Sequence, residues 1–195
     1  RYYHTTEASD PGSIYYHNDQ GSQIGDLYGY IGASYYTNFM NETKDGYDWV
    51  PELAVSDPVP VDGLDANGQS AKWRFEIRQG LKYNTNSTLA DRAAFNNREV
   101  ALEDFLTPYK LMFNQANALY RGGEAANATG ASAIKGAKAY YEATAKAKKG
   151  ILTDAEANFS QVGVKAYEED GKWYFEYELG APVTMFYARY YISSS

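Results

Sequence analysis

The stretch Phe159–Tyr187, FSQVGVKAYEEDGKWYFEYELGAPVTMFY, contains the clearest pattern in the chain. The runs Val162–Ala166 and Trp173–Leu179 alternate apolar and polar side chains, as a half-buried β-strand does. Between them lies Asp170-Gly171, and an Asp-Gly pair supplies the positive φ angles that a tight hairpin turn needs. The stretch therefore predicts a hairpin whose aromatic face packs on a core. We expect Gly180-Ala181-Pro182 to end its second strand, because proline cannot donate to a ladder.

Size and composition narrow the function classes. At 195 residues the chain is long enough for one domain with a real core. The net charge of −7 argues against non-specific electrostatic binding to nucleic acid or to an anionic membrane. The chain has no cysteine, so disulfides and thiolate chemistry are excluded. It also has no apolar run long enough to span a bilayer. We expect no signal peptide, and a chain that opens as a mature or trimmed protein would.

Other segments predict further elements. The best single strand is Lys72–Arg78, in which Trp73, Phe75 and Ile77 share one face. The remaining expectations are a strand at Arg1–Thr6, a helix at Gln23–Phe39, a helix around Phe105–Ala116 that is kinked or begins at Pro108, a Gly/Ala/Asn linker at Arg121–Gly130, and a helix at Ala131–Lys149 capped by Gly150.

Several of these segments also resemble one protein family. The VGVKA strand, its acidic turn, the aromatic strand and the following small residue with proline are similar to a segment of bacterial oligopeptide-binding proteins. Trp73–Tyr83 (WRFEIRQGLKY), Val50–Ala54 and Ile134–Tyr140 resemble the same family in the same order. The similarity runs from about Tyr2 to Ile192. The chain thus resembles family 5 of the extracellular solute-binding proteins, in its Gram-positive lipoprotein form.

The resemblance implies a fold. It predicts an α+β chain that forms part of the N-terminal lobe of a periplasmic-binding-protein-like fold (type II, peptide-binding), with a mixed or antiparallel sheet flanked by helices. Residues 1–195 would form a single domain, a fragment of the first lobe of a larger two-lobed protein. Because such proteins close two lobes on the ligand, this lobe by itself is expected to bind peptide weakly or not at all.

The resemblance also implies a function. The chain would be the substrate-binding component of an oligopeptide ABC importer, which captures extracellular peptides and delivers them to a membrane permease. The implied partners are an oligopeptide ligand and the ABC permease subunits, without nucleic acid. The implied location is extracytoplasmic, on the cell surface, with the membrane reached only through a lipid anchor outside these residues.

Five residues are candidate ligand contacts by this resemblance. The loop Glu7-Ala8-Ser9-Asp10 matches the family loop that meets the peptide, and Tyr120 matches a cleft tyrosine. Each also has a simpler interpretation, as a surface loop and as a surface ring. We expect no cofactor, no metal and no catalytic residue, since the only histidines, His4 and His17, lack metal-ligand spacing.

Two other function classes stay open. One is an adhesion or sensory module, such as a pheromone-binding protein, on the same fold. The other is a carbohydrate-binding or glycosidase domain, suggested by the 20 tyrosines and the acidity. A sugar stacked on Trp73 or Trp173 would favour the second alternative, although both tryptophans are predicted to face the core.

Overall fold

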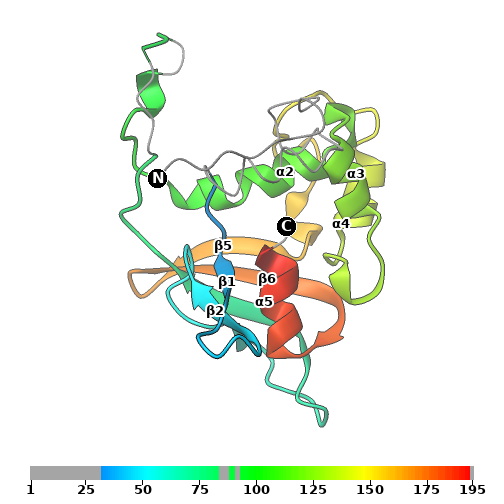
Figure 1. The fold of residues 1–195 in the computed structure, drawn as a ribbon. Helices are drawn as coiled ribbons and strands as arrows, with labels where there is room; N and C mark the ends of the chain where they lie inside the picture. The colour runs from blue at the N-terminus through cyan, green and yellow to red at the C-terminus, as the bar shows by residue number, and fades with distance from the viewer. Residues whose placement is uncertain (1–31, 84–87, 91–92, 194–195) are drawn as a thin grey trace, which may run out of the picture.

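Two antiparallel sheets organise the chain (Figure 1). The structure is a computed structural model that describes residues 32–83, 88–90 and 93–193. The smaller sheet pairs β1 (Tyr36–Met40) with β2 (Tyr47–Pro51). The larger sheet has the order β3 (Val59–Pro60), β4 (Ser70–Ile77), β6 (Lys172–Val183) and β5 (Val164–Glu169). The described chain is therefore of the α+β class, with antiparallel strands.

The predicted hairpin is confirmed. Glu169 of β5 pairs with Lys172 of β6, and the two residues between them have positive φ angles, 53° at Asp170 and 76° at Gly171. Such angles give the turn a twist that matches the twist of the strands. The strand β6 does not end at Gly180, however, but continues through Pro182 to Val183. The β4–β6 register shifts next to this segment, so the proline stands where the ladder is already irregular.

Helices cover the aromatic face of the larger sheet. The α-helices are α2 (Thr107–Phe113), α3 (Tyr120–Ala126), α4 (Ala137–Ala143) and α5 (Met185–Ser193). Short 3-10 turns connect them: η2 (Ala93–Phe95), η3 (Leu102–Phe105), η4 (Gln115–Asn117), η5 (Gly130–Ser132) and η6 (Phe159–Gln161). In Figure 1, α2, α3 and α4 gather on one side of the molecule, while α5 lies beside β1 and β2.

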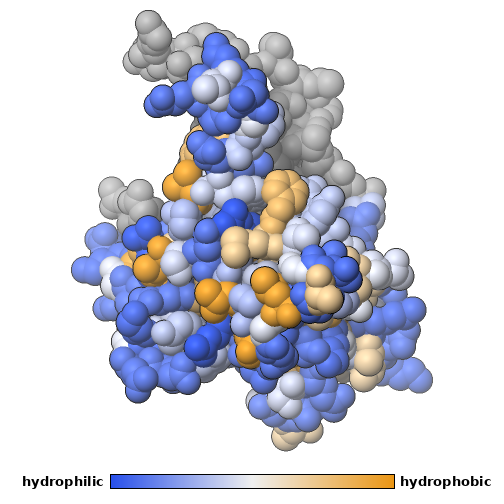
Figure 2. Space-filling view, turned by 90° about the horizontal axis from the view of Figure 1, so that it is seen from below, coloured by the Kyte–Doolittle hydropathy of each residue, from blue (hydrophilic) through white to orange (hydrophobic). Residues whose placement is uncertain are grey.

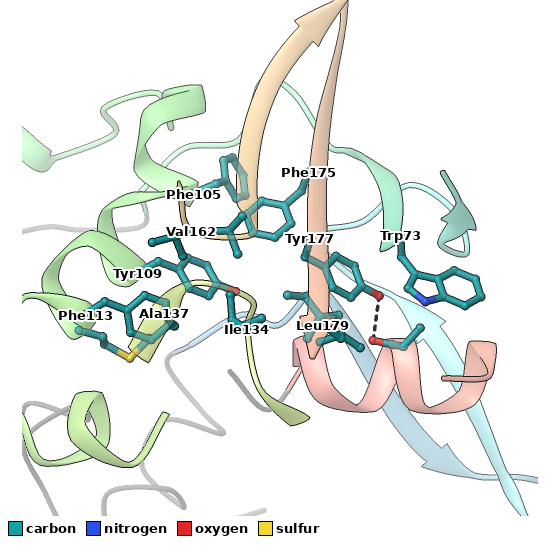
Figure 3. Close-up of a cluster of buried hydrophobic side chains, with 14 of the residues drawn as sticks. Trp73, Phe105, Tyr109, Phe113, Ile134, Ala137, Val162, Phe175, Tyr177 and Leu179 are labelled. Carbon is teal, nitrogen blue, oxygen red and sulfur yellow. Dashed lines mark hydrogen bonds between the residues drawn. The ribbon is translucent and has the colours of Figure 1, made fainter. Parts of the chain in front are cut away.

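The core forms where these elements meet (Figure 3). Phe175 is fully buried on β6, with its ring centroid 5.7 Å from that of Tyr109 on α2 and 5.7 Å from that of Phe75 on β4. Tyr177 is also buried, and its hydroxyl donates to the Ala188 carbonyl of α5 at 2.9 Å. Burying one such aromatic side chain stabilises the fold by roughly 1.5–3 kcal/mol. The alternation read in β4 and β6 therefore marks the face that the helices cover.

Three predicted elements differ from the structure. Residues 36–39 of the expected helix Gln23–Phe39 lie in β1, because they pair with β2, whereas residues 23–31 lie outside the described residues, as does the expected strand Arg1–Thr6. Residues 121–126 of the expected linker Arg121–Gly130 lie in the helix α3. A Cβ on Gly122 would lie 2.2 Å from the Met112 carbonyl oxygen, so small residues here let α3 approach α2 closely.

The expected long helix Ala131–Lys149 shortens to α4. Before it, Ile134 forms a bridge with Leu179, and the Lys135 N–H donates to the Glu178 carbonyl at 2.9 Å, so these residues extend along β6. After it, the Thr144 hydroxyl accepts the Gln115 N–H at 3.0 Å. Tertiary contacts thus overrode helix propensity at both ends. The helix around Phe105 divides into η3 and α2, and Pro108 stands in the first turn of α2.

Candidate functional site

The strand β5 lies at one edge of the larger sheet. In the described part of the chain no strand pairs with its outer side. The Glu178 N–H donates to the Gly163 carbonyl at 2.7 Å, so Gly163 faces β6. Because antiparallel residues alternate in the direction of their backbone groups, Ala166 and Glu168 direct theirs away from β6. Neither residue takes part in the backbone hydrogen bonds found outside the described strands and helices.

A hollow of about 460 Å³ lies along this edge. Its lining comes from β5, β6, the α2 region and the segment that leads into β5: Leu106, Lys110, Asp154, Phe159, Ser160, Val164, Lys165, Ala166, Tyr167 and Glu176. The open backbone groups of Ala166 thus border a space with both apolar and charged walls. This combination of strand edge and hollow is called the β5 edge site below.

Charged pairs order the outer face of the sheet at this site. Glu176 is only 9% exposed and lies 3.0 Å from the Lys72 ammonium, and it also accepts the Tyr167 hydroxyl at 3.3 Å. The Lys165 ammonium lies farther from Glu176, at 3.8 Å. The hydrogen bond from Lys72 to Glu176 is the main cause that raises the pKa of Lys72. Glu176 therefore forms its closer ion pair with Lys72, and its ion pair with Lys165 is the longer one.

The inner wall is organised around Phe159. Its ring meets the Tyr140 ring edge to face at 5.3 Å, and the Lys110 ammonium lies 5.6 Å from its centroid. Lys110 also forms an ion pair with Glu103. Burial is the largest cause that raises the pKa of Tyr140, followed by the negative charge of Asp154. Tyr140 does not line the hollow itself; its ring supports Phe159 from behind, and its hydroxyl is buried without a hydrogen-bond partner.

The backbone at an open strand edge can take one kind of ligand particularly well. An extended chain laid beside β5 would exchange hydrogen bonds with Ala166 and Glu168, and its side chains would reach the hollow. No three His, Cys, Asp or Glu side chains gather as a metal-binding group within residues 32–83, 88–90 and 93–193. The carboxylates Glu103 and Asp104 pair with Lys110 and Arg98, which gives them structural partners.

The structure describes one of the five residues predicted from the sequence as ligand contacts. Glu7, Ala8, Ser9 and Asp10 fall outside the described residues. Tyr120 is the first residue of α3, is 40% exposed and does not line the hollow. A hydrogen bond with Glu124 is the main cause that raises the pKa of Tyr120. The role of all five as ligand contacts stays a prediction.

Sequence reasoning did not identify the β5 edge site. The alternation of Val164 and Ala166 predicts a strand, but the order of strands in a sheet is not written in one strand's pattern. The Asp170-Gly171 turn fixes that β5 pairs with β6 on one side. Only the position of β4 on the other side of β6 leaves β5 at the edge.

The tryptophans bear on the carbohydrate alternative. Trp73 is 0% exposed, and its indole N–H donates to the Ser70 carbonyl at 2.8 Å. Trp173 is partly buried against the same core. The prediction that both face the core is confirmed, so Trp73 offers no ring for a sugar to stack on.

Neither a family model, nor a curated protein, nor a solved structure matches this chain. No helix in the described part of the chain combines the length and apolar character needed to cross a membrane. On the face seen in Figure 2, hydrophilic residues make up most of the surface, with separate hydrophobic residues among them.

Proposed function

We propose that this chain is the substrate-binding component of an oligopeptide importer and that it holds peptides in an extended form. The observation that carries the proposal is the open backbone edge of Ala166 and Glu168 beside a hollow of about 460 Å³. Main-chain hydrogen bonds at a strand edge recognise what all peptides share, which suits a protein that accepts many sequences.

The sequence supports the rest of the proposal. The segments with the strongest resemblance to oligopeptide-binding proteins are Trp73–Tyr83 and Phe159–Pro182. They contain all of β5 and most of its paired strand β6 and of β4. The proposal includes a type II periplasmic-binding fold of which this chain forms part of one lobe. It also includes delivery of the peptide to permease subunits, outside the cytoplasm, with a lipid anchor beyond these residues.

The expected affinity is low. A short peptide gains a few main-chain hydrogen bonds, each worth about 0.5–1.5 kcal/mol net, and some apolar contact, while association costs at least about 4 kcal/mol. A dissociation constant of 1 mM corresponds to about −4.1 kcal/mol and therefore needs about 8 kcal/mol of gross interaction, so we expect this chain alone to bind a short peptide no more tightly than about 1 mM. Titration of the ¹⁵N-labelled chain with blocked pentapeptides, followed by NMR, is suited to this range.

The test uses a proline at the edge. Ala166→Pro removes the outward N–H but no β5–β6 hydrogen bond, and prolines are tolerated at strand edges in this orientation. Ala166→Ser keeps the N–H and serves as the matched control. In the wild type, we expect the titration to shift the amide signals of Ala166 and Glu168. In Ala166→Ser, we expect the same shifts at position 166 and at Glu168. We expect Ala166→Pro to lose peptide binding. Peptide shifts confined to other parts of the chain, or unchanged binding by the proline variant, would refute the assignment.

A further inference from the structure

The two faces of the β5 edge site differ in chemistry. Successive side chains of a β-strand point to opposite faces, and residues opposite each other on neighbouring strands share a face. A peptide residue opposite Ala166 would therefore lie on the helix-covered face. The residues on either side of it, opposite Lys165 and Tyr167, would lie on the outer face.

The inner face favours an apolar side chain. Leu106, Phe159, Val164 and Ala166 provide its apolar surface. The charge of Lys110 is already balanced by Glu103, and its ammonium lies over the Phe159 ring. Asp154 is the other charged residue on this wall, and it would repel an acidic side chain placed there.

The outer face offers a cation. Lys165 has a side chain that is 59% exposed, and its nearest carboxylate, Glu176, lies 3.8 Å away. Glu176 is engaged more closely by Lys72, at 3.0 Å. The other carboxylate on this face of β5, Glu169, is paired with Arg74 at 3.1 Å. Lys165 is therefore the charge that an added strand would meet, and opposite charges on facing strands attract.

We propose that the β5 edge site selects extended peptides in which apolar and acidic side chains alternate. The apolar residue lies opposite Ala166 and the acidic residue opposite Lys165. This inference rests on the proposed peptide binding at the same edge and adds the class of peptide to it. One favourable charge pair of this kind gives a preference of about two- to fivefold.

The experiment exchanges charges on both partners. Two blocked pentapeptides, acetyl-Val-Glu-Val-Glu-Val-amide and acetyl-Val-Lys-Val-Lys-Val-amide, are titrated against the wild-type chain and against Lys165→Glu. We expect the wild type to prefer the glutamate peptide by about two- to fivefold, and Lys165→Glu to prefer the lysine peptide. Lys165→Gln, which removes the charge without reversing it, is expected to bind both equally.

A matched control separates local from overall charge. Lys138→Glu makes the same change of charge on the exposed surface of α4, away from the lining of the hollow. We expect it to keep the wild-type preference. Equal binding of both peptides by the wild type, or reversal by Lys138→Glu as well, would overturn the selection that we propose. If neither peptide nor any other extended peptide binds the wild type, the assignment of peptide binding to the β5 edge site fails, and the proposed selection fails with it.

Discussion

Asn114 is the residue whose loss we expect to show most clearly how the wall of the hollow is held. Its side chain is 0% exposed and lies just after α2. The amide nitrogen donates to the carbonyls of Lys148 and Gly150, each at 2.9 Å, and the amide oxygen accepts the Ala116 N–H at 3.1 Å. These bonds connect α2 to the segment that continues into the wall residues Asp154 and Phe159.

The cost of Asn114→Ala follows from the groups left without partners. The Gly150 carbonyl keeps a bond from Asn117 at 3.2 Å, whereas the Lys148 carbonyl and the Ala116 N–H lose the Asn114 side chain. A buried polar group left unsatisfied costs about 1–3 kcal/mol. Because both lost bonds are only partly buried, each group is expected at the low end of this range. We therefore expect the free energy of unfolding to fall by about 2–3 kcal/mol, a large part of the 5–15 kcal/mol typical of a domain.

Urea unfolding, followed by tryptophan fluorescence, measures this loss. The matched control is Asn38→Ala on the exposed part of β1, which should change the free energy of unfolding by less than about 0.5 kcal/mol. A loss below about 1 kcal/mol for Asn114→Ala would show that water replaces these bonds at little cost. The same variant should also weaken peptide binding, because the wall residues would no longer be held in place.

Two further predictions concern backbone geometry and pH. Gly136 has a φ of 76°, and a Cβ there would lie 2.2 Å from the Gln161 carbonyl oxygen. At Gly63 the φ is 81°, but nothing lies within 4 Å of a Cβ built there. Gly136→Ala should therefore lower the melting temperature more than Gly63→Ala does. Similar melting temperatures for both variants would contradict the contact argument. The hydrogen bond with Lys148 is the main cause that lowers the pKa of Glu156 from 4.5 to about 2. Since the folded pKa is the lower one, the stabilisation is present above pH 4.5 and is lost as pH falls toward 2. Glu156→Gln should therefore flatten the dependence of stability on pH in this window, and an unchanged slope in acid titrations would refute the assignment.

The hairpin and the aromatic face of the sheet were predictable from the sequence because both depend on local rules. The alternation of Trp173, Phe175 and Tyr177 has the period of a strand, and Asp170-Gly171 has the φ angles of the turn. The same holds for β4, whose buried residues alternate with charged ones. A pattern with a two-residue period needs no knowledge of distant partners.

The lengths of the helices and the open edge depended on partners far along the chain. Residues 133–135 have strong helix formers after them, yet they extend because β6 offers them hydrogen bonds. Likewise, the glycines of α3 predicted a linker from the sequence. In the structure α3 packs on α2, and a side chain at Gly122 would not fit between them. The β5 edge site also depended on distant partners. The sequence of β5 determines its own alternation, but only the strand order β3-β4-β6-β5 leaves its outer backbone without a neighbouring strand. Hydrogen bonding between strands depends on which strands are neighbours in space.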